Sequence, residues 1–213
     1  QMSNTAREVI IPSNSKTFRT VFLYVGQGDA TLMVVPDGES RKYVLIDSNV
    51  DETTGGIDLK KLLGDLLDEE EILDVFINTH PHADHVRGVK GIHEAVTIGE
   101  VWHSGHVPGK AHEDAYKELK AVMKAVGPAN VYELRGTRSE NTLDHAEKPV
   151  VHPIGDVSYN VLSPAKYVKD DIEGEKPEVR YQRIHEHCGV IRFTYGSTVV
   201  GILHTGDSDR KAW

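Results

Sequence analysis

The chain has 213 residues, which is enough for one domain with a substantial hydrophobic core. Its 33 acidic residues outnumber 24 basic ones and give a formal charge of -9, which argues against a protein that coats nucleic acid through a basic surface. A single cysteine, Cys188, excludes an intrachain disulfide. No apolar run approaches the roughly 20 residues that cross a bilayer, and the N-terminus lacks a signal-peptide pattern, so we expect a cytoplasmic protein that does not bind membranes.

The first third of the sequence predicts a flexible segment, a strand meander and a helix. Residues 1–16 are polar, and we expect them to form a flexible segment ahead of one domain over 17–213. β-Branched and aromatic residues predict three strands joined by short turns, over 18–25, 31–35 and 42–46. These strands would form an antiparallel meander at the edge of a sheet. Leucines at helical spacing predict a helix over 58–67.

The rest of the sequence alternates strands and helices. Apolar runs and periodicity predict strands over 73–78, 98–102, 131–134 and 157–162, a final hairpin of strands over 190–194 and 198–204, and helices over 84–95 and 111–126. The stretch 166–182 is charged and has no periodicity, so we expect an exposed loop there. This order of elements predicts an α/β sandwich.

Side chains that bind metals are concentrated directly after the strand predicted over 73–78. Three imidazoles and one carboxylate occur within six residues, and they belong to His80, His82, Asp84 and His85. Because side chains alternate along an extended loop, His80 and His82 project to the same side and can share one ion. Asp84 and His85 come after a bend and can bind a second ion, as in hydrolases with two metals. We therefore interpret this segment as half of a metal site.

Carboxylates from other strands would complete such a site. Asp207 follows the last predicted strand and is the best candidate for a ligand that bridges two ions. Asp47 ends the strand over 42–46, and we expect it to hydrogen-bond the ligand loop rather than to bind metal. A pair of ions would generate hydroxide from a bridging water at neutral pH and stabilise the leaving oxygen. We assign the catalytic roles to Asp84, which would also orient that hydroxide, and to His85.

The residues from His80 to His85 match the His-x-His-x-Asp-His motif of the metallo-β-lactamase fold superfamily. The resemblance covers nearly the whole chain, since a strand ending in Asp47 precedes the motif and a strand ending in Thr-Gly-Asp207 follows it. The segment 25–30, Val-Gly-Gln-Gly-Asp-Ala, resembles a turn of one branch, typified by the nuclease-like domain of the competence DNA-uptake protein ComEC. The resemblance implies an αββα sandwich, two divalent ions (zinc or manganese) at one edge of the two sheets, and hydrolysis of a phosphodiester.

Two features depart from the pattern of the superfamily. A further histidine normally binds the first metal, and here the corresponding segment offers His185, which fits best, and His187 as runner-up. We predict that His185 binds metal and that His187 and His103 contact substrate. The family also continues past the Thr-Gly-Asp strand to a last histidine for the second metal, whereas this sequence ends at Trp213. We therefore expect a sandwich without its last C-terminal elements, and either a weak or absent second ion or a partner chain that completes the site.

The sequence leaves three functional hypotheses open. The leading hypothesis is a nuclease or phosphodiesterase that cleaves DNA or RNA through a metal-activated hydroxide, as an effector or processing domain of a larger protein. The second is a hydrolase of lactones, thioesters or cyclic nucleotides at the same site, which the negative charge slightly favours. The third is a latent domain with an incomplete site.

Overall fold

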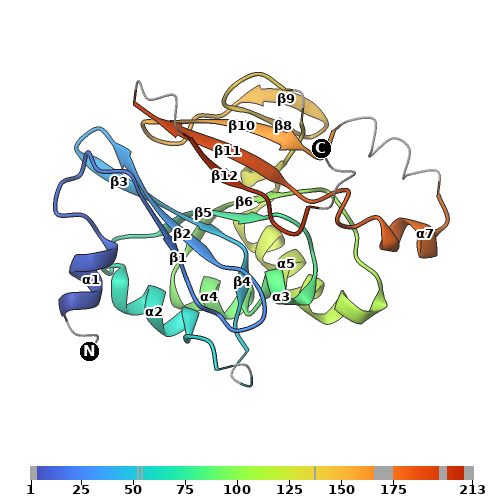
Figure 1. The fold of residues 1–213 in the computed structure, drawn as a ribbon, viewed down its shortest axis with the longest axis horizontal. Coiled ribbons are helices and arrows are strands. Elements are labelled where there is room, and N and C mark those ends of the chain that lie inside the picture. The colour runs from blue at the N-terminus through green and yellow to red at the C-terminus, as the bar shows by residue number, and fades with distance from the viewer. Residues whose placement is uncertain are drawn as a thin grey trace.

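The computed structural model describes residues 4–51, 53, 55–136, 138–165, 175–196 and 201–208. Within these ranges the strands form two sheets, and helices lie against the larger one on the side away from the smaller (Figure 1). The larger sheet has the described strand order β1 (Arg19–Phe22), β2 (Thr31–Asp37), β3 (Ser40–Ile46), β5 (Leu73–Asn78), β6 (Ile98–His103), β7 (Val131–Glu133), β8 (Thr142–His145) and β9 (Lys148–Val151). The smaller sheet has the order β10 (Val157–Ser163), β11 (Val190–Tyr195) and β12 (Gly201–His204).

The remaining described elements are helical, apart from the short strand β4 (Ser48–Asn49). They are α1 (Asn4–Ile10), α2 (Leu59–Leu66), α3 (Ala83–Val86), α4 (Val89–Ala95), the 3-10 turn η2 (Lys110–His112), α5 (Glu113–Val126), the 3-10 turn η3 (Pro128–Asn130) and α7 (Pro177–Gln182). Among the described residues, no helix is both long enough and apolar enough to cross a bilayer.

The strand directions bring the ligand loop to one edge of the large sheet. Strands β1, β2 and β3 pair antiparallel at the end of the sheet, which confirms the predicted meander. Strands β3, β5, β6 and β7 run parallel, so their carboxyl ends meet at one edge. Asp47 follows β3, and Thr79 and His80 follow β5, at this edge. Parallel pairing therefore places side chains side by side that are more than thirty residues apart in sequence.

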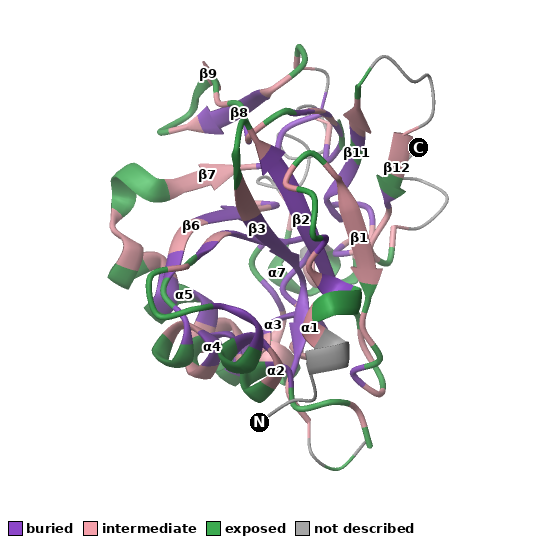
Figure 2. Cartoon of the chain, turned by 90° about the vertical axis from the view of Figure 1, so that its left-hand side faces the viewer, coloured by how far each residue is buried: buried purple, intermediate pink, exposed green. Residues whose placement is uncertain are grey.

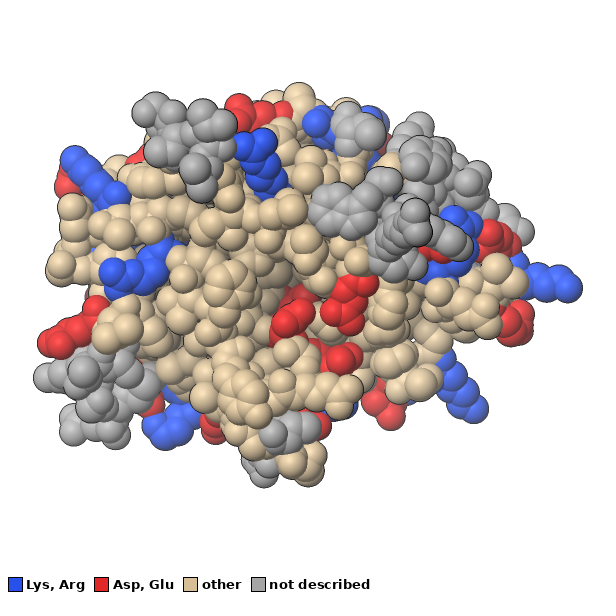
Figure 3. Space-filling view, viewed as in Figure 1, with Lys and Arg blue, Asp and Glu red and all other residues tan. Residues whose placement is uncertain are grey.

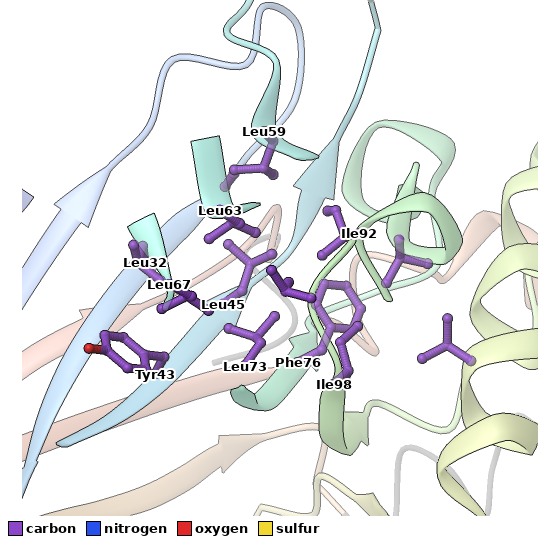
Figure 4. Close-up of a cluster of buried hydrophobic side chains, with 14 of the residues drawn as sticks. Leu32, Tyr43, Leu45, Leu59, Leu63, Leu67, Leu73, Phe76, Ile92 and Ile98 are labelled. Carbon is purple, nitrogen blue, oxygen red and sulfur yellow. The ribbon is translucent and has the colours of Figure 1, made fainter. Parts of the chain in front are cut away.

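Two apolar layers lie on the two faces of the large sheet. Alternate residues of β2 and β3 belong to different layers, as the period of two in a strand requires. Leu45 and Phe76 pack against helices α2 and α4, together with Leu59, Leu63 and Ile92 (Figure 4). The opposite face of the sheet packs against the small sheet through Met33, Val44, Ile77, Tyr159 and Phe193. The buried parts of these elements face inward and the exposed parts of the helices face outward (Figure 2).

This arrangement confirms the predicted α/β sandwich. Helices α2, α4 and α5 form one outer layer, and the two sheets form the centre (Figure 1). The described residues place no second helical layer over the small sheet, where Leu162 and Leu203 are 44% and 45% exposed.

The helix predicted over 84–95 is wrong in one respect, because the structure contains two helices there. Helix α3 ends at Val86 and α4 begins at Val89. Between them Gly88 has a φ of 82°, in the left-handed region, and its N–H donates to Glu118 on α5. The same segment bridges to β4 through Val86 and Arg87. The break therefore fixes α3, the helix that carries Asp84 and His85, between β4 and α5.

The exposed loop predicted over 166–182 is also wrong in its last part. Residues 177–182 form α7, which begins with Pro177 and carries Glu178 in its first turn, both favourable at a helix start. Residues 166–174 lie outside the described part of the chain. The helix leads into a turn over 183–187 that carries His185.

Two further segments form elements that the sequence did not predict. The segment 1–16, expected to be flexible, contains α1, and Ile10 at its end is buried. Arg7 on this helix donates to the carbonyl of Leu66 and to Asp68 at 2.7 Å. The flexibility of this segment stays a prediction. Strands β8 and β9 form an antiparallel hairpin between β7 and β10, where we expected no element.

Candidate metal centre

Four ligand atoms converge at the carboxyl edge of the parallel strands. His80 Nε2 lies 3.2 Å from His82 Nδ1, and His185 Nε2 lies 3.3 Å from the same atom. Asp207 Oδ2 lies 3.8 Å from His80 Nε2 and 3.9 Å from His185 Nε2. Four ligands placed tetrahedrally around zinc at its usual bond length are about 3.3 Å apart. The group His80, His82, His185 and Asp207 thus has the size that one ion needs.

Asp47 controls which nitrogen of His80 faces this group. Its Oδ2 accepts the hydroxyl proton of Thr79 at 2.6 Å. The Thr79 oxygen can then accept only, so His80 Nδ1, 3.1 Å away, donates to it. The proton of His80 therefore lies on Nδ1, and the lone pair on Nε2 points at the other ligands. This arrangement confirms the predicted role of Asp47, which hydrogen-bonds the ligand loop.

His85 is oriented by the same carboxylate. Its Nδ1 donates to Asp47 Oδ2 at 2.9 Å, and its Nε2 lies 3.4 Å from Asp207 Oδ2. Both His85 and Asp47 are buried, while Asp207 is exposed. Asp47 has a φ of 56°, a conformation that aspartate tolerates better than most residues, and this allows the chain to turn sharply after β3.

The surroundings of these histidines set opposite protonation states. Burial, with the neighbouring charges of His85 and His82, lowers the pKa of His80 to about 2. Burial and His112 lower the pKa of His82 to about 4. Burial also acts to lower the pKa of His85, but the carboxylates of Asp47 and Asp207 outweigh it and raise the pKa to about 11. His80 and His82 are thus neutral at pH 7, the form that binds metals, and a metal ion at His85 Nε2 would replace a proton.

Glycine is required where the last strand meets the ligand loop. Gly206 has a φ of 47°, and a Cβ at this position would overlap both Cys188 Sγ and Thr79 Oγ1. The turn that carries Asp207 therefore packs directly on Thr79. The N–H of Gly189 also donates to the Thr79 carbonyl at 2.7 Å. These contacts hold the bridging candidate Asp207 in place beside the histidines.

The roles predicted for Asp84, His103 and His187 stay predictions, and the structure shows where these residues lie. The carboxylate of Asp84 lies half-buried and joins none of the three groups of ligand atoms found in the described residues. The second of these groups contains Asp47 with His80 and His85, and the third contains Asp29 with His85 and Asp207. The substrate contacts proposed for His103 and His187 stay predictions.

His103 and His187 lie outside the ligand groups among the described residues. His103 ends β6, and its Nδ1 accepts the N–H of Gly105 at 3.0 Å. His187 is only 3% exposed, and its ring centroid lies 5.0 Å from that of His106. A substrate that contacted His187 would therefore need access to a buried ring.

His112 belongs to the site although the sequence did not point to it. Its ring stacks on that of His82 with centroids 4.1 Å apart and an angle of 27°. Its Nδ1 accepts the backbone N–H of Ala83 at 3.1 Å, which leaves a proton on Nε2 of the neutral ring. A histidine one residue before a helix carries no local signal, because its neighbours in space come from another loop.

The likeness to solved structures is distant. A metallo-β-lactamase from Cronobacter sakazakii with a HARLDQ motif shares 14% identity over 86% of this chain and 60% of its own, with a TM-score of 0.41. A HARLDQ-motif mutant from the same organism shares 14% identity over 82% of this chain and 56% of its own, also with a TM-score of 0.41. An archaeal metallo-β-lactamase superfamily protein from Sulfolobus tokodaii shares 18% identity over 67% of this chain and 54% of its own, with a TM-score of 0.36. The chain thus spans less than two thirds of each of these structures.

The family comparison covers most of the sequence. No curated protein matches the chain. The model of the family Lactamase_B, described as the metallo-beta-lactamase superfamily, matches residues 23–209, a stretch that contains every candidate ligand described above. The chain therefore belongs to the metallo-β-lactamase superfamily.

Proposed function

We propose that the chain is a metal-dependent hydrolase that cleaves phosphodiester bonds of DNA or RNA. One observation carries the hydrolase part of this proposal, namely the convergence of His80 Nε2, His82 Nδ1, His185 Nε2 and Asp207 Oδ2. One proton can bridge only two of these atoms, whereas a divalent ion binds all four. Three imidazole nitrogens and one carboxylate are a usual zinc ligand set.

The residues around the ligands have separate roles in the proposed reaction. When bound, divalent ions supply a water of lowered pKa and neutralise charge on the leaving oxygen. Asp47 and Thr79 keep Nε2 of His80 and Nε2 of His85 directed at the other ligand atoms, so no ring has to rotate when an ion binds. Asp84, in the first turn of α3, offers a carboxylate outside these groups that can accept the proton of the attacking water.

A phosphodiester is favoured over other substrates by the turn over 25–30, which resembles that of the ComEC nuclease-like domain. The surface does not supply positive charge for such a substrate. Acidic side chains gather around a hollow in the middle of the face shown in Figure 3, and Lys and Arg side chains lie further out. An anionic phosphate would be repelled there unless cations reversed the local field. We therefore expect phosphodiester binding to depend on bound metal.

The acidic hollow also favours a second candidate function. A small, uncharged or weakly charged ester, such as a lactone or a thioester, would not need a basic track for binding (Figure 3). The net charge of -9 points in the same direction. The same ligand group would serve this hydrolysis, so substrate profiling has to separate the two candidates.

Cleavage assays with defined metals test the proposal. The chain, loaded with Zn²⁺ or Mn²⁺, is incubated with supercoiled DNA, single-stranded RNA, bis(p-nitrophenyl) phosphate, a lactone and a thioester. We expect cleavage of the phosphodiesters that is lost with EDTA, with Asp207→Asn and with Asp84→Ala. Asp114→Asn is the matched control, because Asp114 is 97% exposed on α5 and pairs only with Lys117 among the described contacts.

The outcomes separate the hypotheses. Hydrolysis of the lactone or the thioester alone would overturn the nuclease proposal in favour of the second candidate. Nucleic-acid cleavage that survives EDTA and Asp84→Ala would come from a contaminant or from other residues, and would also overturn it. A protein that binds zinc but hydrolyses none of the five substrates would support a latent domain.

A further inference from the structure

We propose that a cavity between α1 and the first residues of β1 and β3 binds a phosphate monoester. The cavity has a volume of about 610 Å³, and its lining includes three arginines, Arg7, Arg19 and Arg41, and one acidic residue, Glu8. Cavities of about 300–1,000 Å³ are usual for small-molecule ligands. The inference goes beyond the proposed function and does not depend on it.

This cavity lies far from the candidate metal centre. Arg41 is near the start of β3, and Asp47 directly follows the end of the same strand. Strand β3 has seven residues and rises about 3.3–3.4 Å per residue, so its two ends are about 20 Å apart. A ligand in the cavity would therefore not contact the metal ligands.

The strand register brings two of the arginines to one face of the large sheet. Arg19 of β1 lies opposite Val34 of β2, which lies opposite Tyr43 of β3. Arg41 precedes Tyr43 by two positions, so its side chain points to the same face as that of Arg19. Helix α1 lies on this face next to α2 (Figure 1), and it buries Ile10 in the same apolar layer as Tyr43. The end of α1 therefore meets both arginines.

The charge of Arg7 is already neutralised. Its guanidinium group pairs with Asp68 at 2.7 Å and lies 3.7 Å from Glu71. The carboxylate of Glu8 is exposed on α1 and makes no ion pair within the described ranges. The positive charge that a ligand meets in the cavity therefore comes mainly from the other two arginines.

Arg19 and Arg41 are held by backbone carbonyls instead of carboxylates. Arg19 donates to the carbonyl of Val9. Arg41 Nη2 donates to the carbonyls of Pro12 at 2.6 Å and Ser13 at 3.3 Å. A carbonyl fixes the position of a guanidinium group without cancelling its charge. Two cations thus line one cavity of a chain whose formal charge is -9, and an anion between them would be attracted to both.

Arg41 also has a donor that the fold leaves without an acceptor. Its Nε is buried and has no hydrogen-bond partner in the part of the chain that the structure describes. Buried donors are normally paired, so an unpaired one indicates a ligand or a water that accepts its proton. The guanidinium group has five N–H donors in a planar fork, which suits the oxygens of a phosphate.

The number of charges favours a phosphate monoester over other anions. Such a group carries a charge of about -1.5 to -2 at pH 7 and has three strong acceptor oxygens, which matches two guanidinium groups without a carboxylate partner. A carboxylate carries one charge, and one arginine fork satisfies both of its oxygens. A phosphodiester also carries only one charge, so a nucleic-acid backbone matches the cavity less well. Ile11 and Pro12, which also line the cavity, offer apolar contact to the carbon part of an ester.

Calorimetric titration in EDTA at about pH 8 tests the inference, because EDTA keeps ions out of the candidate metal centre and the phosphate is doubly charged. The probes are inorganic phosphate, AMP, and one oligonucleotide with and without a 5′ phosphate, and dimethyl phosphate is the singly charged control. We expect phosphate and AMP to bind wild type, and dimethyl phosphate to bind at least about tenfold more weakly. The two oligonucleotides show whether the monoester belongs to a free nucleotide or to a nucleic-acid end.

Matched arginine variants locate the binding. Arg19→Gln and Arg41→Gln should each weaken AMP binding at least about tenfold, because each removes a charge-assisted hydrogen bond. Arg192→Gln is the control and should change the affinity less than about threefold, since Arg192 is exposed on β11 outside the cavity. Unchanged affinity in both cavity variants would overturn the inference, as would equal affinity of wild type for AMP and dimethyl phosphate, or no binding of any probe that carries a phosphate monoester.

A measurement on wild type covers the case in which the cavity variants do not fold, since both arginines also hold α1. Amide NMR signals are followed during phosphate titration in EDTA. We expect shifts over residues 8–13 and at Arg19 and Arg41. Shifts over 79–85 instead would place the phosphate at the candidate metal centre and overturn the inference. The hydrolase proposal is unaffected by any of these outcomes, because metal-dependent cleavage is measured separately.

Discussion

Replacing Asp47 with asparagine removes the charge that organises the ligand loop while it keeps the size of the side chain. Asn also tolerates the left-handed φ of 56° at this position, so the backbone is not the cause of any effect. Asp47 accepts four hydrogen bonds from groups that are buried, from the Thr79 N–H at 2.8 Å, the Thr79 hydroxyl at 2.6 Å, His85 Nδ1 at 2.9 Å and Asn78 Nδ2 at 3.2 Å.

The expected loss of stability follows from this burial. Asp47 and His85 are 1% and 2% exposed, and breaking a buried ion pair by removing one partner typically costs about 3–5 kcal/mol. The Thr79 bonds contribute about 1 kcal/mol each, and part of this remains because the amide oxygen of Asn can still accept. We therefore expect Asp47→Asn to lower the free energy of unfolding of the metal-free protein by about 3–5 kcal/mol. Zinc affinity should fall about 10- to 100-fold, because His80 and His85 lose their fixed tautomers.

Urea unfolding in EDTA measures the first quantity, and zinc titration measures the second. Asp74→Asn is the matched control, since Asp74 is a half-buried carboxylate near the start of β5 that accepts the Tyr43 N–H at 2.8 Å, away from the ligands. It should lose stability but keep zinc affinity. The proposed role of Asp47 would be refuted if Asp47→Asn bound zinc as tightly as wild type, or if it unfolded within about 0.5 kcal/mol of wild type.

Two further changes have defined outcomes. Because the pKa values of His80 and His82 are lowered to about 2 and about 4, the unfolded chain binds more protons below its ordinary histidine pKa of about 6.5. The metal-free protein should therefore lose stability as the pH falls from about 6.5 to 4, by up to about 1.4 kcal/mol per pH unit for each histidine. A melting temperature in EDTA that stays constant over this range would contradict the conclusion that His80 and His82 are neutral in the folded protein. Gly206→Ala should push the turn that carries Asp207 away from Thr79 and reduce zinc affinity at least about tenfold. Gly64→Ala on α2 is the control and should keep zinc affinity, because a Cβ there meets nothing within 4 Å. Equal zinc affinity in the two variants would contradict the role of the close packing at Gly206.

Local sequence patterns predicted most elements of the large sheet. The strand over 73–78 and the helix over 58–67 follow from apolar runs and leucine spacing, and the structure has β5 over the same residues and α2 within the predicted range. These patterns predict such elements correctly because the residues on the buried face of a helix or strand recur at a fixed spacing along the sequence. They fail for α7 and for the hairpin of β8 and β9, whose residues are too polar to show a period. They fail also at Gly88, because a helix break there depends on Glu118 from α5.

The sequence by itself determined that His80, His82 and His85 are close together, since they lie on one short loop after a buried strand. The sequence also pointed to Asp207, but only the tertiary structure showed how Asp207 and Asp29 come close to these histidines. Asp207 reaches His85 because Gly206 allows a close packing on Thr79, and Asp29 reaches it because Gly28 and Asn49 press a distant turn against α3. Asp84 is the neighbour of His85 in sequence, yet it lies outside these groups. The physical reason is that one turn of a helix points adjacent side chains in different directions, so proximity along the chain is no measure of a shared ligand position.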